Sequence, residues 1–407
     1  MTATHPDLIL RGGHVIDPLN DLDGPADVAI ADGRIVAVGP NLSTEGAARV
    51  LDVSGRYVTP GIIDMHAHVF HWHQRSRLSL DPHVNTFSAG VTTVVDAGTS
   101  GWKDFEVFKT KVIDTAKIRV LAFVNIVGQG MASGGLGGDF EHDAREMRPE
   151  LAAAVAREYG DIVVGIKTAH YWARRPFDAE HLPWTAVERA VEAGDLCRKP
   201  VMVDFFPWLP ERPYPTLILE KMRPGDIHTH VFAQQFPILD DAGKVNDFMF
   251  RARERGIIFD LGHGAASFWY RLAQPAIQQG FWPDSISTDL HTGNVNGPVF
   301  DMVTTMNKVL AMGVPLRDVI AMSTTAPARE IGHPELGHLS AGACADVAVF
   351  ALDRGAFAFP DCGPANLTGR ERLRAVLTLR AGRTVYNPHG LGLPEWPDAP
   401  PAYWVLR

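Results

Sequence analysis

The stretch Thr59-Pro60-Gly61-Ile62-Ile63-Asp64-Met65-His66-Ala67-His68 ends an apolar run with two histidines that are separated by one residue. Side chains of a β-strand alternate between its two faces, so His66 and His68 are expected to point the same way. Two imidazoles on one face can bind the same metal ion, and imidazole suits zinc and other first-row divalent ions. The stretch therefore predicts a buried strand that carries part of a metal site.

The composition of the 407-residue chain is that of an ordinary globular protein, with 46% hydrophobic and 21% charged residues. Its formal net charge of −9 argues against a nonspecific nucleic-acid surface. No apolar run reaches the ~18 residues of a spanning helix, and the first residues lack the basic and apolar regions of a signal peptide. Cys197, Cys344 and Cys362 show no CxxC spacing and read as reduced thiols. We therefore expect a cytoplasmic protein without nucleic-acid or membrane partners.

Both ends of the chain are predicted to form short β-strands joined by tight turns. Asp32-Gly33, a favoured hairpin pair, and Ala381-Gly382-Arg383 stand at two of these turns. We expect residues 1–58 and 337–390 to form one small β-sandwich domain, with residues 391–407 as a C-terminal extension. The expected strands are Leu8–Ile16, the hairpin Asp27–Val38, Arg49–Val58, Ala345–Leu352 and Leu373–Tyr386.

Residues 59–336 alternate short β-rich runs with helical stretches, two of which are Trp184–Arg198 and Asn246–Arg255. The runs start about 26 to 44 residues apart, which is the size of one β/α unit. Eight such units predict an α/β fold with a (β/α)8 TIM-type barrel. The alternative, a doubly wound open sheet, would carry a Gly-rich dinucleotide turn after its first strand, and this chain has none there. The runs are Gly61–His66, Val91–Asp96, Ile118–Asn125, Ile162–Lys167, Pro200–Asp204, Asp226–His230, Ile257–Leu261 and Ser285–Asp289.

Polar residues stand at the end of each of these apolar runs. In a barrel the carboxyl ends of the strands converge on one mouth, where active sites lie. Buried polar groups cost free energy unless they are hydrogen-bonded or bind a ligand, so their recurrence at the strand ends indicates a functional site. Each residue alone has a structural alternative, such as a core histidine, a helix cap or a turn, and His228 shares the spacing of His230 and competes with it as a ligand. The residues concerned are His66, His68, Asp96, Asn125, Lys167, Asp204, His230, His263 and Asp289, of which Asp96 and Asn125 favour the structural interpretation.

Lys167 ends the run Val163-Val164-Gly165-Ile166-Lys167. It is either a surface lysine just past the strand or a desolvated lysine, whose lowered pKa makes the amine nucleophilic. Such an amine can capture carbon dioxide as a carbamate, which can bridge two cations. Further along, Arg174 and Arg175 are candidate substrate-binding residues because arginine pairs well with carboxylates. Trp172 is a third candidate, either as part of an aromatic pocket or as a residue that packs its loop. A solvated loop is the alternative interpretation of the two arginines.

Together these residues resemble the amidohydrolase superfamily. The opening stretch is similar to that family's first motif, and Asp346-Val347-Ala348-Val349-Phe350 looks like its closing strand. Within the superfamily, Gly165-Ile166-Lys167, Phe259-Asp260-Leu261-Gly262-His263-Gly264 and Ser287-Thr288-Asp289-Leu290-His291 resemble the dihydroorotase-like deacetylase group. The likeness extends from Asp7 to about Asn387, and it implies a metal-dependent (β/α)8 barrel with a flanking β-sandwich.

The resemblance also implies two divalent metal ions, with zinc as the expected metal. The family usually supplies a histidine at the end of the fifth strand, where this chain has Asp204. Either the carboxylate replaces the imidazole as a ligand, which zinc accepts, or it accepts a hydrogen bond and a single metal remains. The other implied ligands are His66, His68 and Asp289 for the first ion, carboxylated Lys167 as the bridge, and His230 for the second ion.

By the same resemblance, Asp289 would be the general base and His263 would orient a small-molecule substrate. The implied reaction is metal-assisted removal of an acyl group, in the first place acetyl, from an amide or ester of a small carboxylic acid. N-acyl amino acids and acylated hydroxy acids are the expected substrates. Two alternatives stay open, namely ring opening of a cyclic amide, as in dihydroorotases and hydantoinases, and a non-catalytic structural partner. Association into a homo-oligomer also stays open.

Overall fold

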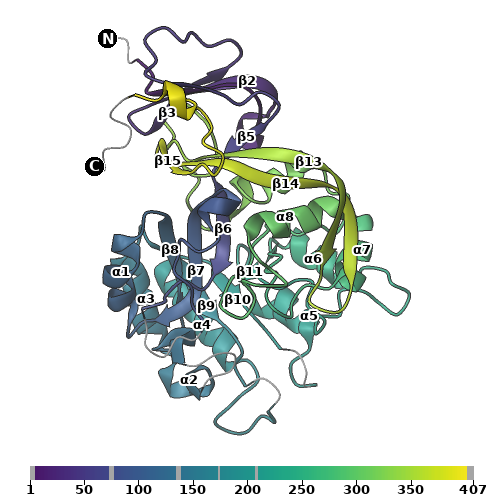
Figure 1. Cartoon of the computed structure of the whole chain (residues 1–407). Helices are drawn as coiled ribbons and strands as arrows, with labels where there is room; N and C mark the ends of the chain where they lie inside the picture. Colours follow the sequence, from purple (N-terminus) through teal and green to yellow (C-terminus); the bar gives the residue numbers. More distant parts are fainter. Residues whose placement is uncertain (1–4, 73–77, 134–138, 173–174, 207–209, 401–407) are drawn as a thin grey trace.

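The chain forms two sheets, one above the other in Figure 1, with helices packed around the lower sheet. The structure is a computed structural model that describes residues 5–72, 78–133, 139–172, 175–206 and 210–400. The upper sheet combines strands from both ends of the chain, and the lower sheet is built from its middle. The prediction of an α/β fold with a separate β unit made from both chain ends is therefore confirmed.

The lower sheet is curled and parallel, and its strands follow in chain order from β12 at one edge to β6 at the other. Each strand overlaps one of the first seven predicted runs. A parallel sheet that is covered on both faces has strands that read as continuous apolar segments, and this is why the runs could be recognised in the sequence. The strands are β6 (Ile62–Ala67), β7 (Val91–Gly101), β8 (Arg119–Asn125), β9 (Val163–Thr168), β10 (Val201–Val203), β11 (Ile227–His228) and β12 (Ile258–Phe259).

The eighth predicted run is not a strand of this sheet, but it joins the two edges of the sheet. Ser285 forms an isolated parallel bridge with Asp260, and Leu290 forms one with Ala67. Near its end, the backbone N–H of Asp289 donates a hydrogen bond of 2.6 Å to the carbonyl of His66. The segment 285–290 therefore lies between β12 and β6, with too few ladder bonds for a regular strand.

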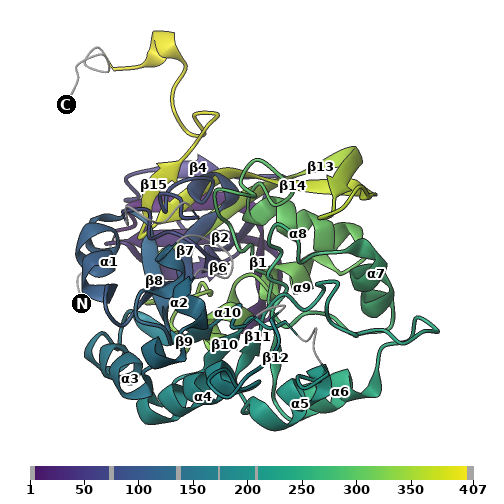
Figure 2. The same ribbon diagram turned by 90° about the horizontal axis from the view of Figure 1, so that it is seen from below.

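Helices follow most of the strands and cover the outside of the lower sheet (Figure 2). The two predicted helices are confirmed as α4 and α6. In α4 the buried positions Ala186, Ala190 and Ala193 recur at helical spacing, and the helix ends where Arg198 adopts φ +57°. The helices are α1 (Phe105–Lys111), α2 (Asp139–His142), α3 (Pro149–Glu158), α4 (Thr185–Cys197), α5 (Tyr214–Thr216), α6 (Asp247–Glu254), α7 (Tyr270–Gln278), α8 (Met302–Ala311), α9 (Leu316–Ala321) and α10 (Thr325–Glu330).

The upper sheet is mixed and continuous, in the order β15-β14-β13-β5-β1-β2-β3, with β4 beside β1. The predicted hairpin at Asp32-Gly33 is confirmed, since φ is +50° and +70° there, as a tight two-residue turn requires. The predicted strand Arg49–Val58 is instead two short strands. The bounds are β1 (Leu8–Asp17), β2 (Leu22–Ala31), β3 (Arg34–Gly39), β4 (Val50–Asp52), β5 (Tyr57–Pro60), β13 (Val347–Pro360), β14 (Asn366–Arg380) and β15 (Arg383–Tyr386).

β13 and β14 form a hairpin that is much longer than the sequence pattern predicted. It leaves the upper sheet and runs along the side of the lower unit beside α8 (Figure 1). Charged residues such as Asp353 and Arg372, which pair at 2.9 Å, occupy its outer part, so the sequence there lacks the apolar alternation that is typical of a strand. At the tip, the backbone N–H of Cys362 donates to the carbonyl of Phe268 at 3.0 Å. The hairpin thus ties the upper sheet to a loop of the lower unit.

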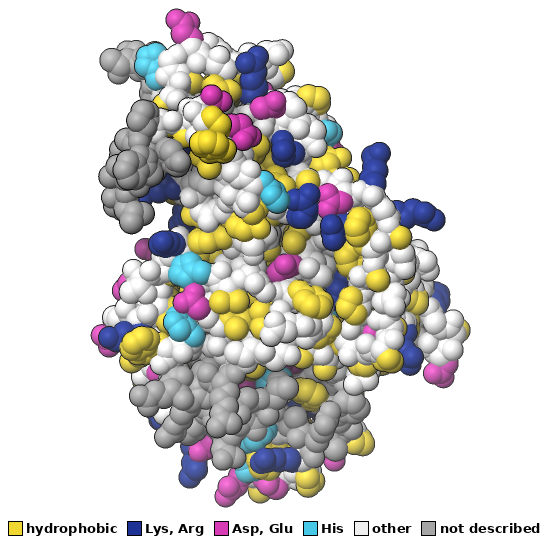
Figure 3. Space-filling model, viewed as in Figure 1, with side chains coloured by type: hydrophobic (Ala, Val, Ile, Leu, Met, Phe, Trp, Pro, Cys, Tyr) yellow, Lys and Arg dark blue, Asp and Glu magenta, His cyan; other side chains and the backbone are white. Residues whose placement is uncertain are grey.

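Acidic and basic side chains are interspersed on the face shown in Figure 3. None of the helices in the described ranges has the length and apolar character needed to cross a membrane. Beyond β15, Leu391 still packs against the upper sheet, and the short 3-10 helix at Trp396–Asp398 lies away from the rest of the molecule (Figure 2).

Candidate active site

A cavity of about 180 Å3 lies at the carboxyl ends of the parallel strands. The structure brings six of the residues singled out from the sequence together in its wall: His66, His68, Lys167, Asp204, His230 and Asp289. Seven further residues with polar or aromatic side chains or a thioether line it as well: Met131, His170, Phe206, Gln234, Gln235, Ser267 and His291. Lys167 is the sole lysine or arginine among the described lining residues.

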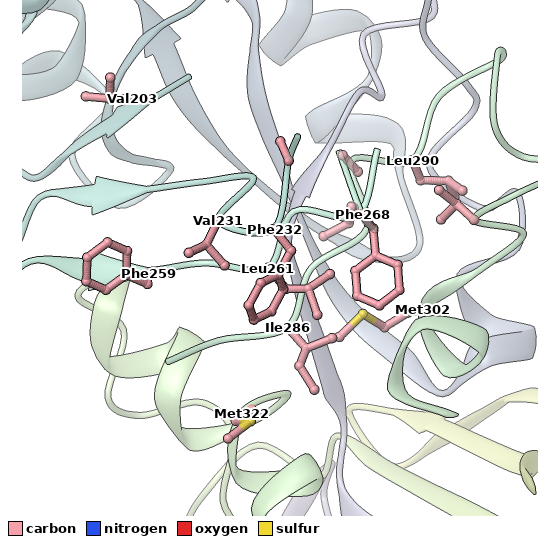
Figure 4. Close-up of a cluster of buried hydrophobic side chains, with 14 of the residues drawn as sticks. Val203, Val231, Phe232, Phe259, Leu261, Phe268, Ile286, Leu290, Met302 and Met322 are labelled. Carbon is pink, nitrogen blue, oxygen red and sulfur yellow. The ribbon is translucent and has the colours of Figure 1, made fainter. Parts of the chain in front are cut away.

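Buried hydrophobic side chains hold the segments that carry the site residues (Figure 4). Phe232 lies two residues after His230, Leu261 precedes the turn at Gly262, and Leu290 follows Asp289. Each of the three hydrophobic residues is less than 5% exposed and belongs to one apolar cluster. Because such a core is densely packed, it fixes the positions of the polar groups beside it.

The side chains of His66 and His68 both point into the cavity, as their spacing predicts. The Oδ1 atom of Asp289 lies 3.5 Å from His66 Nε2 and 3.0 Å from His68 Nε2. Asp289 adopts φ +50°, a conformation that aspartate tolerates better than most residues. Burial on its own would raise the pKa of Asp289, but the two histidines hold it well below its usual range. Asp289 is therefore a carboxylate at neutral pH.

Hydrogen bonds behind the histidines fix which ring nitrogen faces the cavity. Thr229 Oγ1 donates to Asp260 Oδ2 at 2.7 Å, so this hydroxyl accepts a hydrogen bond from His66 Nδ1 at 2.9 Å. His230 Nδ1 lies 2.5 Å from the carbonyl oxygen of Gly262, which can only accept. In the neutral rings, both Nε2 atoms then carry a lone pair that points to the cavity, which is the arrangement of metal-binding histidines.

The donor set fits a divalent cation. Ligand atoms of His66, His230 and Asp289 all lie within 4.8 Å of one another. The neutral His66 ring turns its Nε2 lone pair toward Asp289 Oδ1 at 3.5 Å, and two such acceptors repel each other unless a positive charge lies between them. Burial and the charge of Lys167 lower the pKa of His66 to about 3, so this imidazole is neutral and available as a ligand. Burial opposes a charge on His230 also, but the Asp204 carboxylate raises its pKa to about 9.

Lys167 is 1% exposed, so the interpretation as a surface lysine is wrong. Its Nζ atom lies 3.4 Å from His66 Nε2 and 3.4 Å from Met202 Sδ. Burial lowers the pKa of Lys167, although the carboxylates of Asp204 and Asp289 oppose the shift. The neutral amine, which is the nucleophilic form, is therefore formed at lower pH here than in water.

Asp204 lies at the position of the expected strand-end histidine and contacts two histidines. Its Oδ2 atom is 3.3 Å from His170 Nε2 and 3.5 Å from His230 Nε2. Burial by itself would raise the pKa of Asp204, but these histidines, together with Lys167, hold it well below its usual range.

Three predicted site residues do not line the cavity. His263 is fully buried and its Nε2 atom accepts a hydrogen bond of 2.7 Å from Lys308 Nζ. Trp172 stacks on His181 with ring centroids 3.5 Å apart, and Arg175 lies over the same indole at 5.0 Å. The role of His263 in orienting substrate and the carboxylate-binding role of the arginines stay predictions. Arg174 lies outside the described residues.

Asp96, Asn125 and His228 take structural positions. Asp96 accepts hydrogen bonds from the backbone N–H groups of Val69 and Thr99, and Thr99 in turn contacts His68 Nδ1 at 2.7 Å. Asn125 donates to Gly98 O at 3.1 Å. His228 packs against aromatic rings and does not line the cavity.

Sequence reasoning missed His170 and His291. His291 follows Asp289 by two residues, so the same period-two argument that linked His66 and His68 could have indicated it. His170 lies three residues beyond Lys167 and adopts φ +56°, which no sequence period reveals.

The parallel α/β architecture and the histidine–carboxylate cavity define a metal-dependent enzyme. No family model matches the chain. A curated deacetylase of Enterococcus faecalis is 31% identical over 386 residues, which are 94% of this chain and 99% of the relative. A curated deacetylase of Brucella anthropi is 32% identical over 338 residues, or 81% of this chain and 80% of the relative. A crystal structure of an adenine deaminase is similar with a TM-score of 0.84 and 30% identity, covering 94% of this chain and 100% of that chain.

The chain belongs to the amidohydrolase superfamily, and within it to the dihydroorotase-like deacetylase group. The resemblance seen in the sequence is thereby confirmed, and the protein is a metal-dependent amidohydrolase. Members of the superfamily are generally dimetal enzymes that act on small molecules. Both curated relatives are named for a catalysed reaction, which favours an enzyme over the non-catalytic structural partner.

Proposed function

We propose that this protein is a metal-dependent deacylase that removes an acetyl group from a small acylated acid, such as an N-acetyl amino acid or an O-acetyl hydroxy acid. The observation that carries the proposal is the position of Asp289, whose Oδ1 atom lies 3.5 Å from His66 Nε2 and 3.0 Å from His68 Nε2 in the cavity wall. The two relatives named deacetylase, each at least 31% identical over most of the chain, support acetyl as the group that is hydrolysed from the substrate.

The metal set of the proposal consists of two divalent ions, with zinc as the metal. His66, His68 and Asp289 would hold the first ion, Asp204 and His230 the second, and Lys167 would bridge them as a carbamate. Carbamate formation joins Lys167 Nζ to the carbon of CO2 and releases one proton. The buried amine supports this step because only its neutral form attacks. Bound divalent cations supply Lewis acidity, which lowers the pKa of a water and polarises an acyl carbonyl.

Asp289 handles the proton in this mechanism. Its carboxylate is ionised at neutral pH and is aimed into the cavity, so it can accept the proton of the attacking water. The same oxygen then returns the proton to the departing nitrogen or oxygen of the substrate. The amides of Gln234 and Gln235 and the ring of His291 line the cavity and are available to bind polar groups of the substrate. Phe206 would cover an apolar part of the substrate.

We also propose that residues 59–336 form the catalytic unit as a (β/α)8 barrel that segment 285–290 closes, with residues 1–58 and 337–390 as the accessory domain. The bridges of this segment to both sheet edges support closure. Closure matters for catalysis because it sets Asp289 opposite His66.

Acetate release by the zinc-loaded protein tests the function. The panel contains N-acetyl amino acids and O-acetyl hydroxy acids, both enantiomers of each, with dihydroorotate, a hydantoin and adenine as other substrate classes. Stereoselective release of acetate is expected. No release from any acetylated compound by the metal-loaded protein would overturn the proposal, and turnover of a cyclic amide would favour ring opening instead.

A further inference from the structure

Asp204 stands between two histidines in the wall of the cavity. The three side chains come from consecutive parts of the sheet, because His170 follows β9, Asp204 follows β10 and His230 follows β11. Each is at most 7% exposed, and all three line the cavity. The carboxylate thus meets two imidazole nitrogens in a place that is largely removed from solvent.

The distances between these atoms fit ligands of a shared ion better than hydrogen-bonded partners. A direct N–H···O bond measures about 2.7–3.2 Å, and Asp204 Oδ2 lies farther than that from both histidines, at 3.3 and 3.5 Å. Two donors that each lie about 2.1 Å from one tetrahedral ion stand about 3.4 Å apart. The two observed distances lie on either side of that value.

The orientation of the rings supports the same interpretation. His230 Nδ1 is turned to the carbonyl of Gly262, so Nε2 is the ring nitrogen that faces Asp204 and the cavity, as in metal-binding histidines. His170 holds a left-handed backbone conformation, φ +56°, which costs free energy in a non-glycine residue and is concentrated at functional sites.

We propose that His170 is a metal ligand in this chain and that it forms the second cation position together with Asp204 and His230. It would take the place of the histidine that related enzymes carry at the end of the fifth strand, supplying the imidazole from the loop after β9 instead. This inference rests on the proposed function, since it completes the metal site of that enzyme.

Metal content per chain tests the inference independently of activity. The protein is loaded with zinc, freed of unbound metal and analysed by inductively coupled plasma mass spectrometry. We expect two ions in the unmodified protein and one in His170→Ala. His291→Ala is the matched control, because it removes a cavity histidine whose ring lies near His68 rather than Asp204, and it should keep both ions. Cobalt-loaded samples should show the same contrast in their visible absorption.

A rescue variant separates ligand loss from general damage. Asp204→His in the His170→Ala background puts an imidazole back at the end of β10, and we expect it to restore the second ion. Thermal melting identifies variants that do not fold, and His170→Gln, which keeps most of the side-chain volume, is measured in the same way if His170→Ala fails to fold.

Two results would overturn the inference: a folded His170 variant that binds two ions with unchanged affinity, or an unmodified protein that never binds more than one. In contrast, an unmodified protein that binds two ions and loses one in His170→Ala, but releases no acetate, would overturn the proposed function and leave His170 as a ligand.

Discussion

Replacing Asp289 by asparagine removes one negative charge and one proton acceptor from the cavity while keeping the size of the side chain. The backbone contacts of this residue survive the change, since its N–H donates to His66 O at 2.6 Å and its carbonyl accepts from Asn294 Nδ2 at 2.7 Å. Asparagine also tolerates φ +50°, so the replacement adds little backbone strain. Asp289→Asn therefore tests the chemistry of the carboxylate rather than the fold.

The expected loss of activity follows from the role of the carboxylate. A positioned general base contributes about 10²–10⁴-fold to a rate, which corresponds to about 3 to 5 kcal/mol of transition-state stabilisation. Because the Oδ1 atom also lies 3.0 Å from His68 Nε2, the variant weakens the first metal position as well. We therefore expect kcat to fall at least a hundredfold, with little change in the thermal midpoint of the metal-free protein.

The assay is acetate release at saturating zinc, with metal content measured on the same samples. Asp284→Asn is the control. This partly buried carboxylate precedes the segment 285–290 directly, accepts a hydrogen bond from the backbone N–H of Phe259 and does not line the cavity. It should keep normal turnover. A kcat for Asp289→Asn within tenfold of the unmodified protein would refute the assignment of Asp289 as the base.

Three further changes probe the surroundings of the site. Lys308→Met removes the buried amine that donates to His263 at 2.7 Å, and we expect urea denaturation to show a loss of about 1–3 kcal/mol, whereas an unchanged midpoint would count against this bond. Burial, with nearby carboxylates, raises the pKa of Glu330 from 4.5 to about 8, so the folded protein keeps a proton that the unfolded chain loses and stability falls as the pH rises from about 4.5 to 8. Glu330→Gln should remove this fall and be the more stable form at pH 9, by up to about 5 kcal/mol, with the gap closing towards pH 5 in denaturant titrations. Gly264→Ala would put a methyl group 2.8 Å from Asp289 Oδ2 at a backbone φ of +56°, so both the thermal midpoint and acetate release should drop, and normal values for both would contradict the close approach.

The sequence by itself determined the strands of the lower sheet and the residues at their ends. Apolar runs at regular spacing identify parallel strands, and parallel strands bring their carboxyl ends to one edge whatever the details of packing. His66, Lys167 and Asp204 therefore line one cavity, as their positions in the runs predicted. The spacing of His66 and His68 also predicted correctly that both side chains point into the cavity, because side-chain direction within a strand follows a period of two.

Tertiary structure alone decided what happens beyond the strand ends. There the backbone leaves the β region, at His170 (φ +56°) and His230 (φ +63°) for example, and a side chain then points where the local dihedral angles send it. His170 turns to Asp204, whereas His263, which also follows a strand of the lower sheet, turns to Lys308. No sequence period describes these turns, because they depend on which buried partner, tens of residues away in the chain, satisfies the polar group.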